Sequence, residues 1–144
     1  MADTLAHEQR ETITEVVEYP EHVQRTESAL FRANKRLLVR QLDLPCWICG
    51  SRENREVHHL HEWALWSDLD AERVLDSLHA FDPYGFTKAD PESPVGSPDD
   101  KRNLLVLCAE HHRAVEKGIH RLTGEIWLAQ RAAKPGVSIT KPAC

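Results

Sequence analysis

The sequence has no long apolar run and few aromatic side chains. None of its apolar segments approaches the roughly 20 residues that cross a bilayer, and the first residues lack a basic region followed by an apolar one. We therefore expect no membrane association, no secretory leader and a cytoplasmic protein. Aromatic residues make up only 6% of the 144 residues. A compact unit with so few aromatics is expected to rely on a bound metal as well as on burial.

Cysteine is scarce too, but its placement is informative. Three of the four cysteines fall into two short patterns, Cys46-x-x-Cys49 and Cys108-x-x-His111. In a reducing compartment such spacing is more typical of metal binding or redox chemistry than of disulfides. The alternatives are a thioredoxin-like motif, for which the chain lacks the βαβ setting, and unrelated buried cysteines. Since two knuckles supply the four ligands of a tetrahedral ion, the sequence predicts a structural Zn²⁺ site.

Positive charge is in deficit, with a net charge of −5 that is unevenly distributed. Residues 1–21 carry six acids against Arg10 alone, and residues 62–102 carry ten acids against four bases. Residues 22–42 are the exception, with five bases against Glu27. This distribution argues against tight, salt-resistant, nonspecific binding to nucleic acid. A few well-placed cations and a metal ion can nevertheless bind phosphate groups. Solvated helix faces are the alternative interpretation of each run.

The chain divides into a polar acidic arm (1–20), an amphipathic helix (21–43), a compact domain (44–128) with an insertion (62–102), and a tail (129–144). Within the domain, apolar spacing predicts a helix over 70–81 with Asp68 or Asp70 as its N-cap. Proline and glycine predict a loop over 82–100. A short β-like segment over 56–61, a buried strand over 104–107 and a helix over 111–119 complete the expected elements.

A second group of side chains has the types needed for metal-assisted hydrolysis. His58 and His59 are adjacent on the first strand, Asn103 precedes the second strand, and His112 begins the following helix. Two adjacent histidines can act as base and metal ligand if the backbone aims both to one side. Glu116 lies four residues after His112, so on a continuous helix it would reach the same ion.

In combination, these patterns resemble the HNH endonuclease family. The matching residues are Cys46-x-x-Cys49, Glu56-Val57-His58-His59, Asp99-x-x-x-Asn103, Cys108-x-x-His111-His112 and the helix that follows. The resemblance implies an α+β fold with a small zinc-stapled ββα-metal (HNH or His-Me finger) core, to which this chain adds an N-terminal helix and a helical or loop insertion. It also implies a bacterial or phage setting.

The resemblance further implies a role for each matching residue. His59 corresponds to the general base and Asn103 to the residue that orients it. His58 and His112, with Glu116 as a further ligand, correspond to the site of a catalytic Mg²⁺ or another divalent ion. The structural zinc ligands are Cys46, Cys49, Cys108 and His111. Where many relatives have another histidine, this chain has Glu116.

The sequence therefore predicts a metal-dependent endonuclease that hydrolyses DNA phosphodiester bonds. The first alternative is a noncatalytic, HNH-derived zinc module that binds a protein partner through the acidic arm or insertion, or binds nucleic acid. The second is a zinc-dependent DNA-binding regulator, for which residues 22–42 offer cations but few base-reading side chains. His61 and His120 are expected to be surface residues, or to contact the ligand residues without binding the metal themselves.

Overall fold

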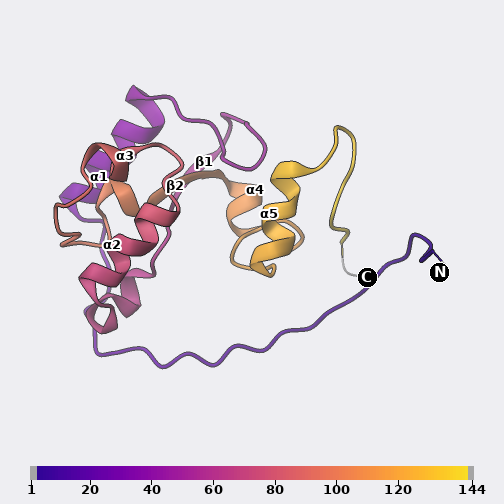
Figure 1. The fold of residues 1–144 in the computed structure, drawn as a ribbon, viewed down its shortest axis with the longest axis horizontal. Coiled ribbons are helices and arrows are strands. Elements are labelled where there is room, and N and C mark those ends of the chain that lie inside the picture. The colour runs from indigo at the N-terminus through magenta and orange to yellow at the C-terminus, as the bar shows by residue number, and fades with distance from the viewer. Residues whose placement is uncertain (1–2, 143–144) are drawn as a thin grey trace.

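The computed structural model describes residues 3–142, in which helices surround one small antiparallel sheet (Figure 1). The elements in chain order are α1 (Ala29–Arg36), η1 (Leu37–Gln41), β1 (Arg55–His59), η2 (Trp63–Asp68), α2 (Ala71–Ala80), α3 (Phe86–Ala89), η3 (Lys101–Asn103), β2 (Leu104–Cys108), α4 (Ala109–Arg113) and α5 (Gly124–Ala132). This mixture of helices with a two-stranded sheet agrees with the expected α+β class. No helix among residues 3–142 combines the length and apolar character needed to span a lipid bilayer.

The N-terminal helix is shorter than predicted. It begins at Ala29 rather than at residue 21, because the Ser28 hydroxyl accepts the Phe31 amide at 2.9 Å and caps the first turn. It continues as the π-helical turn η1, in which the Leu42 amide donates to the Leu37 carbonyl. Residues 3–28 form no helix or strand, and residues 3–19 are exposed, as expected for an arm.

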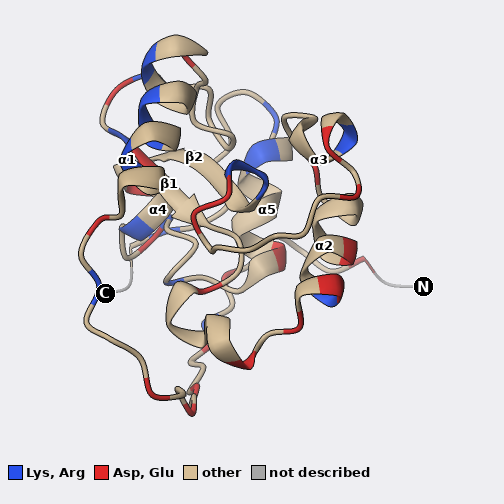
Figure 2. Ribbon diagram, turned by 90° about the vertical axis from the view of Figure 1, so that its left-hand side faces the viewer, with Lys and Arg blue, Asp and Glu red and all other residues tan. Residues whose placement is uncertain are grey.

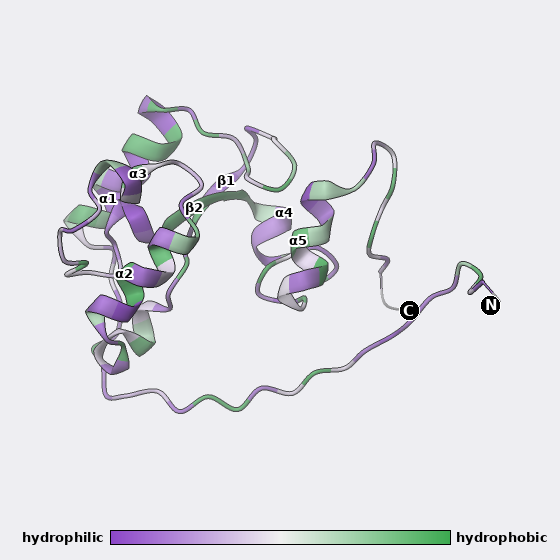
Figure 3. Cartoon of the chain, viewed as in Figure 1, coloured by the Kyte–Doolittle hydropathy of each residue, from purple (hydrophilic) through white to green (hydrophobic). Residues whose placement is uncertain are grey.

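The strands β1 and β2 pair in antiparallel register, with Arg55 opposite Cys108 and His59 opposite Leu104. Every residue of β2 is buried, and β2 is among the most hydrophobic segments of the chain (Figure 3). The outer edge of β2 is also covered, because Val106 donates its amide to the Tyr84 hydroxyl and accepts the Trp47 amide. Both backbone groups of Val106 therefore find partners without a third strand.

The sheet separates two apolar clusters. On one side, Leu105 and Leu107 pack with Cys46, Ile48 and Trp127. On the other side, Leu104 and Val106 pack with Val57 from β1 and with Phe31 and Leu38 from α1 and η1. This separation follows from the alternation of side chains along a strand.

The insertion contains the predicted helix as α2, with Asp70 as its N-cap accepting the Arg73 amide at 3.0 Å. The predicted loop contains the short helix α3 and is tied to the rest of the domain. Its anchor is Arg102, a 5% exposed side chain that donates to carbonyl oxygens of the loop. These acceptors are Asp90, Ser93 and Pro94.

The helix expected over 111–119 is interrupted. α4 ends at Arg113, and the chain folds back so that the Gly118 amide donates to the Ala114 carbonyl at 2.8 Å. α5 then continues to Ala132, past the boundary expected at residue 128. Its buried Trp127 donates through Nε1 to the His111 carbonyl and so fastens α5 beside α4.

Gly118 is required at this turn because a Cβ there would lie 2.7 Å from Arg113 Cα. We expect Gly118→Ala to lower the free energy of unfolding by about 1–3 kcal/mol, since backbone must move to admit the methyl group. Urea denaturation followed by circular dichroism measures this change. Gly124→Ala is the matched control, because a Cβ at Gly124 meets nothing within 4 Å. Equal losses in both variants would contradict the close approach.

Candidate functional site

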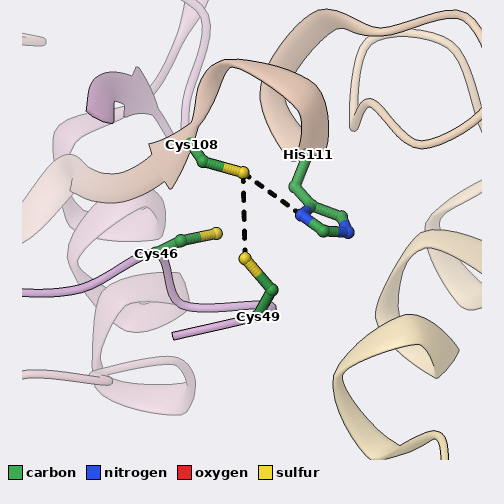
Figure 4. Close-up of side chains that lie close together, drawn as sticks. All are labelled: Cys46, Cys49, Cys108 and His111. Carbon is green, nitrogen blue, oxygen red and sulfur yellow. Dashed lines mark hydrogen bonds between the residues drawn. The ribbon is translucent and has the colours of Figure 1, made fainter. Parts of the chain in front are cut away.

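Two groups of potential metal ligands lie at the sheet, one built from thiols and one from imidazoles. In the first, ligand atoms of Cys46, Cys49, Cys108 and His111 all lie within 4.8 Å of one another. The Sγ atoms of Cys49 and Cys108 are 3.8 Å apart, and Cys108 Sγ lies 3.3 Å from His111 Nδ1. Figure 4 shows the thiols and the imidazole turned toward a common space.

Local backbone structure explains why these side chains converge. Cys46 and Cys49 lie on a tight turn closed by the Gly50 amide, which donates to the Cys46 carbonyl, and Gly50 has a φ of 77°. The Trp47 amide donates to Val106 and holds this turn against β2. Cys108 ends β2, and His111 follows on the first turn of α4.

The thiol group has the dimensions of a tetrahedral zinc site. Sulfurs bound to one zinc at about 2.3 Å lie about 3.8 Å apart, which is the distance between Cys49 and Cys108. Burial and the neighbouring thiols raise the pKa of Cys108 to about 12. Its thiolate therefore requires a nearby cation at neutral pH. These four residues could hold one thiophilic ion.

The second group consists of His58 on β1, His112 on α4 and His120 after the Gly118 turn. Their ligand nitrogens also lie within 4.8 Å of one another. The Nε2 atoms of His112 and His120 are 3.0 Å apart. Two nitrogens bound to one tetrahedral ion at about 2.1 Å lie about 3.4 Å apart, so a small movement of the rings would let this group share a metal.

Glu56 fixes which nitrogen of His112 is available. Hydrogen bonds from Arg113 and then His112 outweigh burial and hold the pKa of Glu56 below its ordinary value, so its carboxylate accepts. His112 Nδ1 lies 2.8 Å from that carboxylate and donates to it. The Nε2 lone pair is therefore left facing His120.

Burial favours the neutral form of two imidazoles of this group, His58 and His120. Burial, followed by the neighbouring rings of His112 and His120, lowers the pKa of His58 to about 3. Burial and then His112 also lower the pKa of His120. Neutral imidazoles are the form that binds metal, and a pocket of imidazoles suits Zn²⁺ and similar transition-metal ions better than Mg²⁺.

His59 points away from this group, so the backbone does not aim His58 and His59 to one side, which was the condition for the pair to act together. Successive side chains of a strand point to opposite faces. His59 Nε2 lies 2.8 Å from Asp99 Oδ1, and its ring stacks on Phe31 with centroids 5.1 Å apart. The side chains of His58 and His59 therefore lie on opposite faces of β1 and are near each other only at the end of the strand.

Asp99 is the centre of a network that sequence analysis did not identify. Its side chain is 4% exposed, and it accepts Arg25 Nη2 at 2.7 Å and Ser28 Oγ at 2.6 Å. Burial alone would raise the pKa of Asp99, but hydrogen bonds from Arg25, Ser28 and His59 outweigh it and lower that pKa. Asp99 is thus a carboxylate, and it links the N-terminal segment to His59.

Asn103 is fully buried and bonds to His61 and the insertion rather than to the His59 ring. Its Oδ1 accepts the His61 amide at 2.9 Å, and its Nδ2 donates to the carbonyls of His61 and Pro98. Its own carbonyl accepts the Leu60 amide, directly after His59. Asn103 thus holds the backbone where β1 ends.

Glu116 is not among the residues brought together in the described part of the chain. Because α4 ends at Arg113, the turn separates Glu116 from the helical position expected for it. His120 occupies the third position instead. Its separation from His112 matches no single helical turn, and the sequence signal for it was Gly118, which permits the chain to reverse.

Comparison with known proteins gives one family. The model of the HNH endonuclease family matches residues 46–119, just over half of the 144-residue chain. The match includes the whole thiol group and His58, His59 and His112, and it excludes α1 and His120. No curated protein and no solved structure matches the chain.

We expect Asn103→Ala to destabilise the domain, because it leaves buried backbone groups around His61 and Pro98 without partners. An unsatisfied buried group costs about 1–3 kcal/mol, and urea denaturation measures the loss. Asn34→Ala is a graded control, since among residues 3–142 the Asn34 side chain donates to one acceptor, the Asp99 carbonyl. A loss no larger than that of the control would contradict a structural role for Asn103.

Proposed function

The chain belongs to the HNH endonuclease family, and on that premise we propose that it hydrolyses DNA phosphodiester bonds with the help of a divalent metal ion. The observation that carries the proposal is the imidazole group of His58, His112 and His120, with Glu56 behind it. It lies near the end of β1, and the next residue on that strand, His59, is a fourth imidazole on the opposite face whose partner is a carboxylate. A metal pocket and a potential base that one substrate can reach are the minimum for phosphodiester hydrolysis.

We assign the role of general base to His59. Because Asp99 is a carboxylate, His59 Nε2 carries a proton and donates to it, and the Nδ1 lone pair is available to accept a proton from water. The Asp99 carboxylate also stabilises the imidazolium that results. Phe31 stacks on the ring and limits its rotation.

The remaining roles follow from position. His58, His112 and His120 would hold the catalytic ion, which supplies a Lewis acid for the charge that develops on the phosphate. Asn103 supports the base through the backbone at Leu60. With the Cys46–Cys49 turn and the start of α4 held by a structural Zn²⁺, β1, β2 and α4 form the ββα-metal core of the family.

The second candidate is a noncatalytic HNH-derived zinc module. One observation favours it: the His59 side chain is only 13% exposed and takes part in an interaction network with Arg25 and Asp99. In such a module His59 would join the N-terminal segment to the sheet, and the protein would bind a partner without cleaving it. Cleavage assays separate the two candidates.

We expect the protein to nick supercoiled plasmid DNA when Mn²⁺, Zn²⁺ or Mg²⁺ is supplied. His59→Ala should lower the rate by about a hundredfold or more, the usual contribution of a general base. His112→Ala should lower it and also weaken metal binding, which calorimetry measures. Agarose gels report the rate.

His7→Ala is the matched control, because His7 lies on the exposed arm and its ring bonds to the nearby Leu5 carbonyl. Full activity of His59→Ala would refute its role as base. If folded, zinc-loaded wild-type protein cleaves no DNA with any of these ions, the noncatalytic module is the better account.

A further inference from the structure

A cationic groove of about 440 Å³ lies between the N-terminal helical segment and the start of β1. Its lining contains five cationic side chains and the single acid Glu27. The cationic residues are Arg32, Lys35, Arg36, Arg40 and Arg55. Figure 2 shows basic residues along α1 and the coil that continues it, and acidic residues on α2. In a chain of net charge −5, this groove is a local reversal of sign.

The cations of the groove are incompletely neutralised. Arg36 and Arg40 are exposed, and within the described residues neither forms a side-chain hydrogen bond or ion pair. Lys35 pairs with Glu27, but both ends of that pair are more than 40% exposed. Water and salt weaken such a pair, so it yields readily to a stronger anion.

The spacing of these residues creates a repulsion that a bound anion would relieve. Arg32, Arg36 and Arg40 follow at intervals of four residues, so their side chains form a row of like charges along one side of the helix. Like charges at this spacing repel and destabilise a helix. The row extends about 12 Å at 1.5 Å per residue, which is the length of roughly three to four nucleotides of one strand.

The groove and the proposed base share one face of β1. Arg55, Val57 and His59 alternate with Glu56 and His58, so the first three point toward α1 and η1. Arg55 and His59 are separated by about 13 Å along the strand. Phe31 connects the groove to His59, because its ring stacks on His59 and Lys35 Nζ lies 5.4 Å from its centroid.

We propose that this groove binds the phosphate backbone of the DNA and directs the strand toward His59, an inference that rests on the proposed nuclease function. Arg36 and Arg40 contact phosphates directly, and Lys35 exchanges Glu27 for a phosphate. Arg55 stays fixed by Asp43 and the Leu44 carbonyl and contributes charge at the floor. The groove lies largely outside the residues that match the family, 46–119.

The test measures DNA binding without cleavage. In the His59→Ala background, with metal present, fluorescence anisotropy gives the Kd of a labelled duplex over a series of salt concentrations. Adding Arg36→Gln and Arg40→Gln should raise the Kd about tenfold and reduce the slope of log Kd against log salt by about 1.8, which corresponds to two phosphate contacts. Circular dichroism verifies that each variant is folded.

A matched control removes the same charge elsewhere. Arg73 on α2 and Lys134 after α5 are both exposed, and Arg73→Gln with Lys134→Gln should leave the Kd within about twofold. An equal effect of both pairs would mean that only net charge matters, and it would overturn the proposal. An unchanged salt slope for the groove variant would overturn the proposal too. So would a loss of affinity that is seen with a labelled RNA but not with the DNA duplex.

The design separates this proposal from the nuclease function. If wild-type protein nicks plasmid but the groove variant binds DNA normally, the groove proposal fails and the nuclease function stands. If wild-type protein cleaves nothing but the groove variant loses duplex affinity and salt slope, the groove is a DNA site on a noncatalytic module.

Discussion

The antiparallel pairing of β1 with β2 is the constraint on which the rest of the structure depends. It joins two segments that are far apart in the sequence and fixes them residue by residue, from Arg55 opposite Cys108 to His59 opposite Leu104. At one end the register brings the Cys46 turn beside the last residue of β2. At the other end it places His58 and His59 beside the insertion. A one-residue shift would exchange the faces of every side chain on β1.

The two faces of β1 have different tasks. One carries Glu56 and His58 toward α4, where metal ligands gather. The other carries Val57 and His59 toward α1, where apolar packing and the Asp99 network hold His59, the proposed base. On the proposed function, a substrate that contacts both the imidazole group and His59 would lie across the end of the strand. It also explains why a helix outside the family core matters: Phe31 and Ser28 position His59 through its ring and its carboxylate partner.

The acidic insertion is compatible with this arrangement because its charges lie apart from the cationic groove, as Figure 2 shows for α2 and α1. Arg102 and Tyr84 fasten the insertion to the domain and to the edge of β2. The net charge of the chain thus gives little information about the surface that we propose binds DNA. The distribution of charge along residues 22–42 gives much more information about that surface.

The sequence alone indicated those parts of the site that depend on short-range spacing. The thiol group follows from two knuckles, and the Asp70 cap follows from a local rule. The opposed directions of His58 and His59 follow from strand alternation, but only once the strand is known to be regular up to His59. His120 replaced Glu116 because α4 stops at Arg113, and the reversal at Gly118 depends on contacts with a distant part of the chain. Asp99 was part of the recognised motif, yet its partners Arg25 and Ser28 lie more than 70 residues away.

The most direct test of this account is a zinc-edge anomalous difference map from crystals grown with excess Zn²⁺. The account predicts one peak among Cys46, Cys49, Cys108 and His111, and a second among His58, His112 and His120, with the His59 ring turned toward Asp99. A second peak bound by Glu116 in place of His120, or one that includes the His59 ring as a ligand, would contradict the division of β1 into two faces. The absence of any peak among the imidazoles would remove the metal pocket on which the nuclease proposal rests.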